Sequence, residues 1–229
     1  MTYKGIDVSH WQGQIDFKKV KDSGIEFVII KAGGSDKGFY KDAKFEYNYR
    51  EAKAAGLSVG AYYFVGKNFY GVESGVADAH RFLDIILGKQ FEYPIFLDVE
   101  TTDARYKEAA TDAAIAFCQT LERSGYFVGI YASDISGYRE KLNHKRILDY
   151  THWVARYGKD PEHCKEYSIF QHSSKGSVPG IPGSVDLDTS RVDFPGIIKE
   201  KGFNGYQRKD DTQDKVTKKG TKKKKTEDK

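Results

Sequence analysis

Segments typical of β-strands alternate with segments typical of α-helices between residues 4 and 133 of this chain. The expected strands are nearly continuous runs of apolar and aromatic residues, at 4–9, 26–32, 57–65, 94–100 and 126–133. Helices are expected between them at 15–24, 40–56, 73–87 and 107–124, and Gly24, Gly56 and Gly125 mark three of their ends. Strands that are apolar on both faces are typical of a parallel sheet covered by helices, so the pattern predicts an α/β fold.

The alternation thins after residue 134. Short strands are expected at 152–157, 167–173 and 184–188, separated by loops rich in Gly, Pro and Ser such as "SKGSVPGIPGS". Five strands followed by helices and three without them predict a barrel that is regular in its first half and irregular in its second. In such barrels the functional residues gather at the C-terminal ends of the strands.

The charge of the chain is unevenly distributed. Residues 207–229 contain ten Lys or Arg and five Asp or Glu, a net charge of +5, whereas the whole chain of 229 residues carries +4. Residues 1–206 are therefore near neutral, which argues against nucleic-acid binding by the folded part. We expect a catalytic domain at 1–206, followed at 207–229 by a Lys-rich disordered tail or linker.

The two cysteines, Cys118 and Cys164, lack the local spacing of a zinc site or a redox pair, and we expect reduced thiols, with Cys118 in a helix core. No histidine pair has readable metal-ligand spacing, so we expect neither a metal nor another cofactor. The first residues, "MTYKGIDVS", resemble no signal peptide, and no apolar run approaches the roughly 20 residues that span a membrane.

Acidic residues occur where the expected strands end. The segment "YPIFLDVET" places Asp98 and Glu100 in an apolar strand, two residues apart and so on one face. Asp7 ends the first strand and Asp186 lies in the last. Asp7 and Asp186 could instead cap turns. A buried charge costs several kcal/mol unless it is paired or used, however, so we expect the four carboxylates to converge on one mouth of the barrel.

Seven segments follow one another with a recognisable order and spacing: "GIDVSHWQGQIDF", "VIIKAG", "FYKDAKFEYNYREAKAAGLSVGAYYF", "PIFLDVE", "GIYAS", "WVARY" and "FQHSSKGSVPGIPGSVDLD". Across residues 3–195 they resemble glycoside hydrolase family 25, the Chalaropsis-type N-acetylmuramidases. The resemblance implies a flattened, TIM-like (β/α)5(β)3 barrel. It also implies cleavage of the β-1,4 bond from N-acetylmuramic acid to N-acetylglucosamine in peptidoglycan, as in the catalytic domain of a phage or prophage endolysin.

By position, Glu100 is similar to the family's general acid, and Asp7, Asp98 and Asp186 are similar to its supporting carboxylates. Two crowded carboxylates resist ionising together, so one of them keeps a proton near neutral pH. We expect Glu100 to donate that proton to the leaving sugar, while Asp98 stays ionised and orients the substrate's acetamido group. Attack by a water molecule activated by Asp7 or Asp186 is the competing route.

Several other residues are candidate substrate-binding groups. Tyr62, Tyr131, Trp153 and Trp11 fall at or near strand ends, where flat rings can stack on sugars, although Tyr62 and Trp153 could equally belong to the barrel core. Lys31 and Gln171 lie in the resembling segments. Two departures from the family pattern, Tyr63 in place of a usual histidine and "KAGGS" without an acidic residue after its lysine, are expected to affect groove shape or subsites.

The alternatives are a barrel glycosidase acting on another N-acetylated glycan such as chitin, and a binding protein without turnover. The expected partner is bacterial peptidoglycan, with anionic wall polymers as a further partner of the basic tail, and the protein is expected to be a monomer. It would act at the bacterial cell wall. Without a signal peptide it would reach the wall from the host cytoplasm on release, as phage enzymes do, or be secreted with a leader absent from this sequence.

Overall fold

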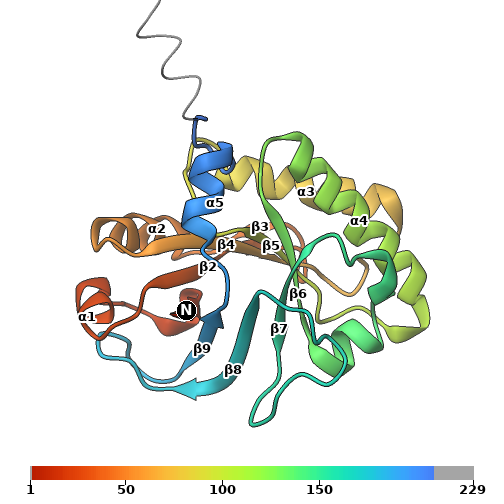
Figure 1. Cartoon of the computed structure of the whole chain (residues 1–229). Helices are drawn as coiled ribbons and strands as arrows, with labels where there is room; N and C mark the ends of the chain where they lie inside the picture. The colour runs from red at the N-terminus through yellow and green to blue at the C-terminus, as the bar shows by residue number, and fades with distance from the viewer. Residues whose placement is uncertain (1, 209–229) are drawn as a thin grey trace, which may run out of the picture.

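Eight strands form a closed barrel in the computed structural model of the protein, which describes residues 2–208 (Figure 1). Neighbouring strands run parallel from the first to the seventh, and the last is antiparallel to both its neighbours, which closes the barrel. The predicted α/β barrel and its eight strands are confirmed. In order around the barrel they are β1 (Tyr3–Val8), β2 (Phe27–Gly34), β4 (Ser58–Phe64), β5 (Ile95–Asp98), β6 (Val128–Ser133), β7 (Thr151–Ala155), β8 (Ile169–Gly176) and β9 (Val185–Ser190).

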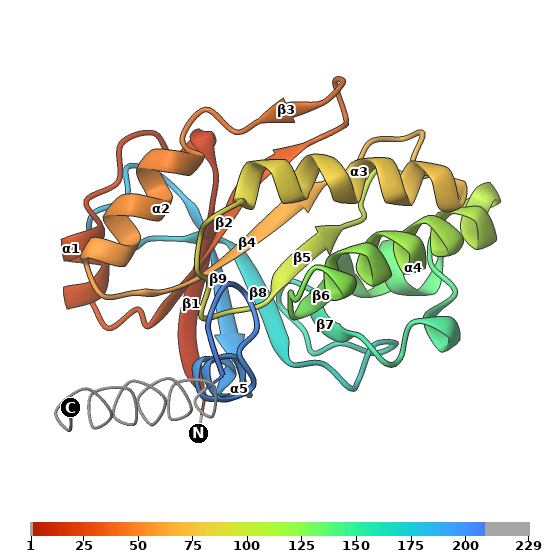
Figure 2. The same cartoon turned by 90° about the horizontal axis from the view of Figure 1, so that it is seen from above.

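Helices cover the outside of the first half of the barrel, as Figure 2 shows. They follow β1, β2, β4 and β5 and are α1 (Phe17–Asp22), α2 (Phe45–Ala54), α3 (Gly71–Ile86) and α4 (Lys107–Arg123). The connection after β6 is irregular and holds a short π-helical segment, η3 (Asp134–Arg139), and a 3-10 turn, η4 (His144–Arg146). Two further 3-10 turns, η1 (His10–Gln12) and η2 (Ala104–Tyr106), follow β1 and β5.

One predicted helix begins later than expected. Residues 40–56 were expected to be helical, but Tyr40–Lys41 forms a short strand, β3, paired antiparallel with β2 through Gly33 and Gly34. A Cβ atom on Gly33 would lie 2.2 Å from the carbonyl oxygen of Tyr40, so only glycine permits this close approach. The helix starts at Phe45, after the side chain of Asp42 has accepted a 2.9 Å hydrogen bond from the amide of Lys44.

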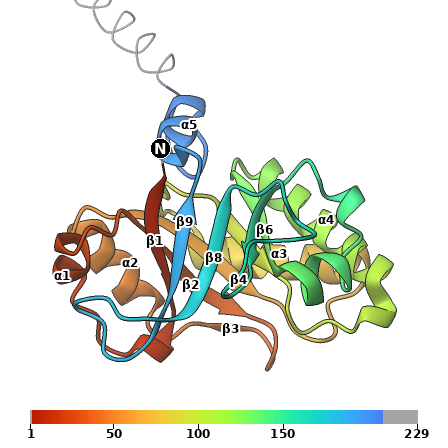
Figure 3. The same ribbon diagram turned by 60° about the horizontal axis from the view of Figure 1, so that its bottom comes forward.

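A terminal helix, α5 (Phe194–Lys201), was not predicted. Asp193 caps it by accepting a 3.1 Å hydrogen bond from the amide of Gly196. Phe194 packs 5.4 Å from Tyr93 and 5.8 Å from Phe127, ring centroid to ring centroid. Both partners precede β5 and β6, so α5 closes the end of the barrel where the parallel strands begin (Figure 3).

The strands separate two hydrophobic layers. The outward-facing layer packs against the helices and includes Cys118 of α4, which is fully buried as predicted. The inward-facing layer fills the barrel with Phe27, Phe96, Tyr131, Trp153 and their neighbours. Toward the C-terminal ends of β1, β2, β5 and β8 the inward positions are polar, and this end is the mouth opposite α5; the residues are Asp7, Lys31, Asp98 and Gln171.

Within residues 2–208 we find no helix with the length and apolar character needed to cross a membrane.

Candidate active site

The mouth of the barrel gathers the predicted carboxylates. Asp7 and Asp186 are direct neighbours in the β1–β9 register, and Asp98 pairs with Phe64 of β4 and Tyr131 of β6. Asp186 lies inside a strand, which excludes the reading that it caps a turn. The carboxylates are close enough for Glu100 to influence both Asp98 and Asp186 electrostatically.

Asp98 and Glu100 differ in exposure to solvent. Strand β5 ends at Asp98, whose side chain is buried, while Glu100 lies in the following loop and is exposed. Burial, and then the charge of Glu100, raise the pKa of Asp98 well above its usual range, although Lys31 counteracts this. Burial thus favours the protonated form of Asp98 in the substrate-free protein, against the expectation that it stays ionised. Its Oδ1 is buried without a hydrogen-bond partner among residues 2–208.

Gln171 connects Asp7 to two tyrosines. Its Nε2 donates a 2.7 Å hydrogen bond to Oδ2 of Asp7, and its Oε1 accepts hydrogen bonds from the hydroxyls of Tyr131 (2.9 Å) and Tyr157 (2.8 Å). Gln171 and Tyr131 are both buried, so the predicted substrate-binding residue Gln171 holds other side chains in place. Tyr157 is half exposed beside the mouth and was not predicted.

Asp188 is a member of the site that the sequence analysis missed. It is buried, its Oδ1 accepts a 2.8 Å hydrogen bond from Nε1 of Trp153, and its Oδ2 has no hydrogen-bond partner among residues 2–208. Burial raises the pKa of Asp188 to about 8. Burial, followed by the charges of Asp188 and Asp186, also raises the pKa of Asp7. The D-x-D spacing in "SVDLD" was a usable signal, because strand residues two apart share a face.

Trp153 does not face the cleft. Its side chain is 1% exposed and packs 4.4 Å from Tyr131 and 5.2 Å from Phe96 between ring centroids, so the prediction that it stacks on sugar is wrong for this structure. Tyr62 is partly buried at 6.0 Å from Trp153. Trp11, by contrast, is 77% exposed just beyond the C-terminal end of β1.

Lys31 is also buried at this end of the barrel. Its Nζ lies 4.3 Å from the ring centroid of Phe64 and 6.0 Å from that of Tyr62. Its charge lowers the pKa of Asp98 against the larger effect of burial. The buried Lys31 ammonium group therefore favours the ionised form of Asp98.

A cleft of about 560 Å³ opens beside Glu100. Tyr131 and Tyr157 line it from the barrel, and residues 133–136 together with Glu140 and Arg156 form its further wall. The cleft has both aromatic surface and hydrogen-bonding groups, the combination that ligand pockets use to orient a bound molecule.

Tyr63, which stands where the family pattern has a histidine, faces away from the cleft. It packs between the sheet and the helices, 5.5 Å from Phe82 and 6.1 Å from Phe117 between ring centroids, and its hydroxyl donates a 3.1 Å hydrogen bond to Asp78. The expectation that this departure affects the groove directly is not supported by its outward-facing position.

Comparison with known proteins identifies the family to which this barrel and its carboxylate site belong. The model of the family described as "Glycosyl hydrolases family 25" matches residues 6–181, which is more than half of the chain. The protein belongs to glycosyl hydrolase family 25. The resemblance seen in the sequence is thereby confirmed, and with it the assignment to the glycoside hydrolases.

Relatives of this family 25 protein include the "Autolytic lysozyme" of Clostridium acetobutylicum, 34% identical over 186 residues, a match covering 81% of this chain and 55% of the relative. "Lysozyme M1" of Streptomyces globisporus is 30% identical, covering 80% of this chain and 66% of the relative. The chain thus spans between half and two thirds of the length of these lysozymes. Among solved structures, the CTP1L endolysin superposes with a TM-score of 0.75 at 30% identity, covering 86% of this chain and 69% of that one.

Proposed function

We propose that this protein is a lysozyme that hydrolyses the β-1,4 bond between N-acetylmuramic acid and N-acetylglucosamine in bacterial peptidoglycan. The proposal rests on one observation above others: an exposed Glu100 stands beside the buried Asp98 at the edge of a cleft of about 560 Å³. Family membership and the lysozymes and endolysin among its relatives support the same substrate.

Glu100 is the proposed general acid. It borders the cleft, whereas Asp98 is buried and does not line the cleft, so Glu100 is better placed to reach the glycosidic oxygen of a bound sugar. A sugar that covers Glu100 removes water from the carboxyl group, and desolvation favours the protonated form. Because the two carboxyl groups titrate as a coupled pair, Asp98 can lose its proton when Glu100 becomes protonated.

Asp98 is proposed to orient the acetamido group of the substrate. Its buried Oδ1 has no partner among residues 2–208, so it would accept a hydrogen bond from the acetamido N–H once a bound sugar has displaced the side chains that cover it. Such a bond favours ionised Asp98 and leaves the proton to Glu100. The acetamido oxygen would then attack the anomeric carbon as an internal nucleophile, as in other substrate-assisted glycosidases.

Activation of a water molecule by Asp7 or Asp186 is the competing route. Oδ2 of Asp7 already accepts a hydrogen bond from Gln171, and the side chain of Asp7 is buried, so Asp7 is poorly placed to take a proton from water. Asp186 is less buried and close enough to Glu100 to be affected by its charge, so it is the stronger candidate for this route.

The experiment that tests the proposed function is incubation with purified peptidoglycan and with chitin, followed by identification of the new reducing ends. We expect N-acetylmuramic acid at the new ends from peptidoglycan and no release from chitin, with Glu100→Gln as the inactive control. Release from chitin would favour the alternative of a glycosidase for another N-acetylated glycan. No release from either would favour a binding protein.

The wider setting is also proposed. We infer action at the bacterial cell wall, by a monomer and without nucleic acid or membrane insertion as part of the activity. The Lys-rich segment 207–229, proposed to bind anionic wall polymers, lies almost wholly outside the described residues, and the boundary at residue 206 stays a prediction.

A further inference from the structure

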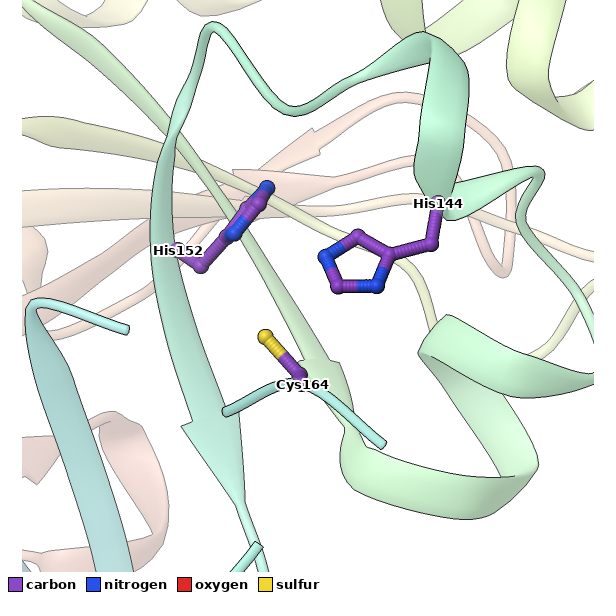
Figure 4. A group of neighbouring side chains, drawn as sticks. All are labelled: His144, His152 and Cys164. Atoms are coloured by element: carbon purple, nitrogen blue, oxygen red, sulfur yellow. The ribbon is translucent and has the colours of Figure 1, made fainter. Parts of the chain in front are cut away.

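Three potential metal ligands converge in the second half of the barrel, outside the carboxylate mouth (Figure 4). They are His144 of η4, His152 of β7 and Cys164 of the β7–β8 connection, and their donor atoms all lie within 4.8 Å of one another. Seven and eleven residues separate them along the chain, so no short ligand pair marks the site in the sequence.

Some nitrogen atoms of this cluster lack a hydrogen-bond partner within the described part of the chain. Nε2 of His144 is buried without a hydrogen-bond partner among residues 2–208. Nδ1 of His152 lies 3.2 Å from the carbonyl oxygen of Glu166, and its Nε2 lies 3.1 Å from that of Ile147. A neutral imidazole has one N–H, so only one of these contacts is a hydrogen bond and the other nitrogen presents its lone pair to an oxygen.

We propose that His144, His152 and Cys164 form a binding site for Zn²⁺. Two imidazole nitrogens and one thiolate are ligands that zinc prefers. One His152 nitrogen would bind the metal while the other donates to a backbone carbonyl, which is the usual arrangement around a metal-bound histidine.

The spacing of the donors fits after a small adjustment. Zinc bonds of about 2.0–2.3 Å in a tetrahedron place the ligand atoms roughly 3.3–3.8 Å apart, so the longest separation in the group, 4.8 Å at most, must shorten by about 1–1.5 Å. Rotation of the His144 ring provides such a movement, since this residue is only partly buried. A water molecule would complete the tetrahedron, or His163, whose ring centroid is 5.2 Å from that of His144.

The ionisation of the three groups is compatible with this site. Burial lowers the pKa of His144 to about 4 and also lowers that of His152, so both rings are neutral ligands near pH 7. Burial raises the pKa of the Cys164 thiol to about 12. Zinc would displace this thiol proton to the solvent, so binding strengthens as pH rises.

A metal here would stabilise one wall of the proposed substrate cleft. The side chain of Asp134 accepts hydrogen bonds from the amides of Glu162 (2.8 Å), His163 (3.0 Å) and Cys164 (2.8 Å), and Asp134 also lines the cleft. Zinc would therefore join η4, β7 and the 156–168 connection behind that wall. The inference concerns the chain's own ligands and does not depend on the proposed peptidoglycan activity.

The test is titration of the full, metal-free, reduced protein with Co²⁺ and with Zn²⁺. We expect one equivalent of Co²⁺ to produce a thiolate-to-cobalt charge-transfer band in the near ultraviolet, which Zn²⁺ then abolishes by displacement. Cys164→Ala should lose this band, whereas the matched control Cys118→Ala, which removes the other buried thiol, should keep it. Absence of the band from the wild type, or its persistence in Cys164→Ala, would overturn the proposal.

A second variant guards against misfolding of Cys164→Ala. Changes to groups that only orient a metal ligand cost about 10- to 100-fold in affinity, so His144→Ala should weaken Zn²⁺ binding by at least about 100-fold. The control His80→Ala removes an exposed histidine of α3 and should bind Zn²⁺ like the wild type. Equal zinc affinity in the wild type and both histidine variants would assign the metal to surface histidines and refute the site.

Discussion

Gln171 and Asp7 are joined by a 2.7 Å hydrogen bond from Nε2 to Oδ2, although 164 positions separate them in the chain. The two tyrosine hydroxyls on Oε1 of Gln171 fix the orientation of its amide, so the N–H side must face Asp7. A neutral side chain thereby connects the buried Asp7 carboxylate to Tyr131 and Tyr157 without adding charge.

Replacing this amide by a carboxylate should make stability strongly pH-dependent. In Gln171→Glu a second carboxylate oxygen would face Asp7, and burial would raise the pKa of both groups. A carboxyl group with a raised folded pKa stabilises fully below its unfolded pKa of about 4 and loses that contribution as pH rises. We expect a larger loss of unfolding free energy at about pH 8 than at about pH 4.5, measured by urea denaturation.

The control for this change is Gln171→Met, which adds no ionisable group. It should cost about 1–3 kcal/mol, because Asp7 and the two hydroxyls lose their partner, and this loss should change less with pH than that of Gln171→Glu. Equal losses in Gln171→Glu at the two pH values would contradict the prediction.

Asp188→Asn should have the opposite effect. The folded pKa of Asp188 is raised to about 8, so its contribution to stability is lost between about pH 4 and pH 8. Asn cannot ionise, its Oδ1 can still accept a hydrogen bond from Trp153, and its Nδ2 would bring no negative charge close to Asp7. We expect Asp188→Asn to gain about 1–3 kcal/mol over the wild type between these pH values, less than about 1.4 kcal/mol per pKa unit because Asp7 shares the titration.

The comparison variant is Asp188→Ala, which leaves the buried Nε1 of Trp153 without an acceptor. It should be less stable than Asp188→Asn throughout the pH range. Parallel pH profiles for the wild type and Asp188→Asn would show that Asp188 is not a buried titrating group.

The carboxylate of Asp134 should stabilise the fold near neutral pH and lose this contribution in acid. Burial alone would raise its pKa, but the amides of Cys164 and Glu162 and the Arg156 guanidinium together lower it. Its contribution is therefore present above the unfolded pKa of about 4 and lost as pH falls through the lower folded value. Asp134→Ala should cost about 3 kcal/mol near pH 7 and less in stronger acid, by chemical denaturation.

Glu162→Ala is the matched control because it removes the other carboxylate paired with Arg156. Its side chain is 66% exposed, so the change should cost less than about 1 kcal/mol. A comparable loss in both variants would mean that the buried hydrogen bonds of Asp134 add little.

The proposed roles of Glu100 and Asp98 are separated by leaving-group chemistry. Glu100→Gln should slow hydrolysis of a natural glycan by about 100-fold or more, the scale of general acid catalysis. An activated aryl glycoside barely needs protonation, so it should restore turnover by Glu100→Gln. Asp98→Asn should stay slow on both substrates, because orientation of the acetamido group is still impaired.

Measurement of kcat on the natural and aryl substrates distinguishes the two roles. Rescue of Asp98→Asn without rescue of Glu100→Gln would assign the proton donor to Asp98 and reverse the proposal. Retained folding, checked by circular dichroism, is expected for both variants because each removes one of two crowded acidic groups.

The basic segment gives a prediction about substrate form. If Lys218–Lys225 draws the enzyme to anionic wall polymers, removal of residues 207–229 should weaken lysis of intact cells, mainly at low salt, because added salt screens charge. Hydrolysis of small soluble fragments should be unchanged. No loss on cells, or equal loss on both substrates, would contradict this role.

Much of the fold and part of the site could be predicted from local sequence pattern. Apolar runs identified the first five barrel strands, because a strand buried on both faces needs apolar residues throughout its length. The last three were recognised as short segments between loops rich in Gly, Pro and Ser. The positions of Asp7 and Asp98 placed them at one end, because parallel strands present their C-terminal ends together. Asp186 reaches the same end for another reason, since β9 is antiparallel to its neighbours and begins there. Strand residues two apart share a face, and applying this to "SVDLD" would have found Asp188 beside Asp186.

The tertiary structure decided which side chains meet solvent and which meet one another. Local pattern could not tell that Glu100 lies beyond the end of β5 while Asp98 is buried, or that Trp153 fills the barrel and donates to Asp188. Nor could it bring His144, His152 and Cys164 together. Periodicity along one strand determines which face a residue occupies, but burial, pKa and ligand geometry depend on atoms contributed by distant segments, and only closure of the barrel places those atoms.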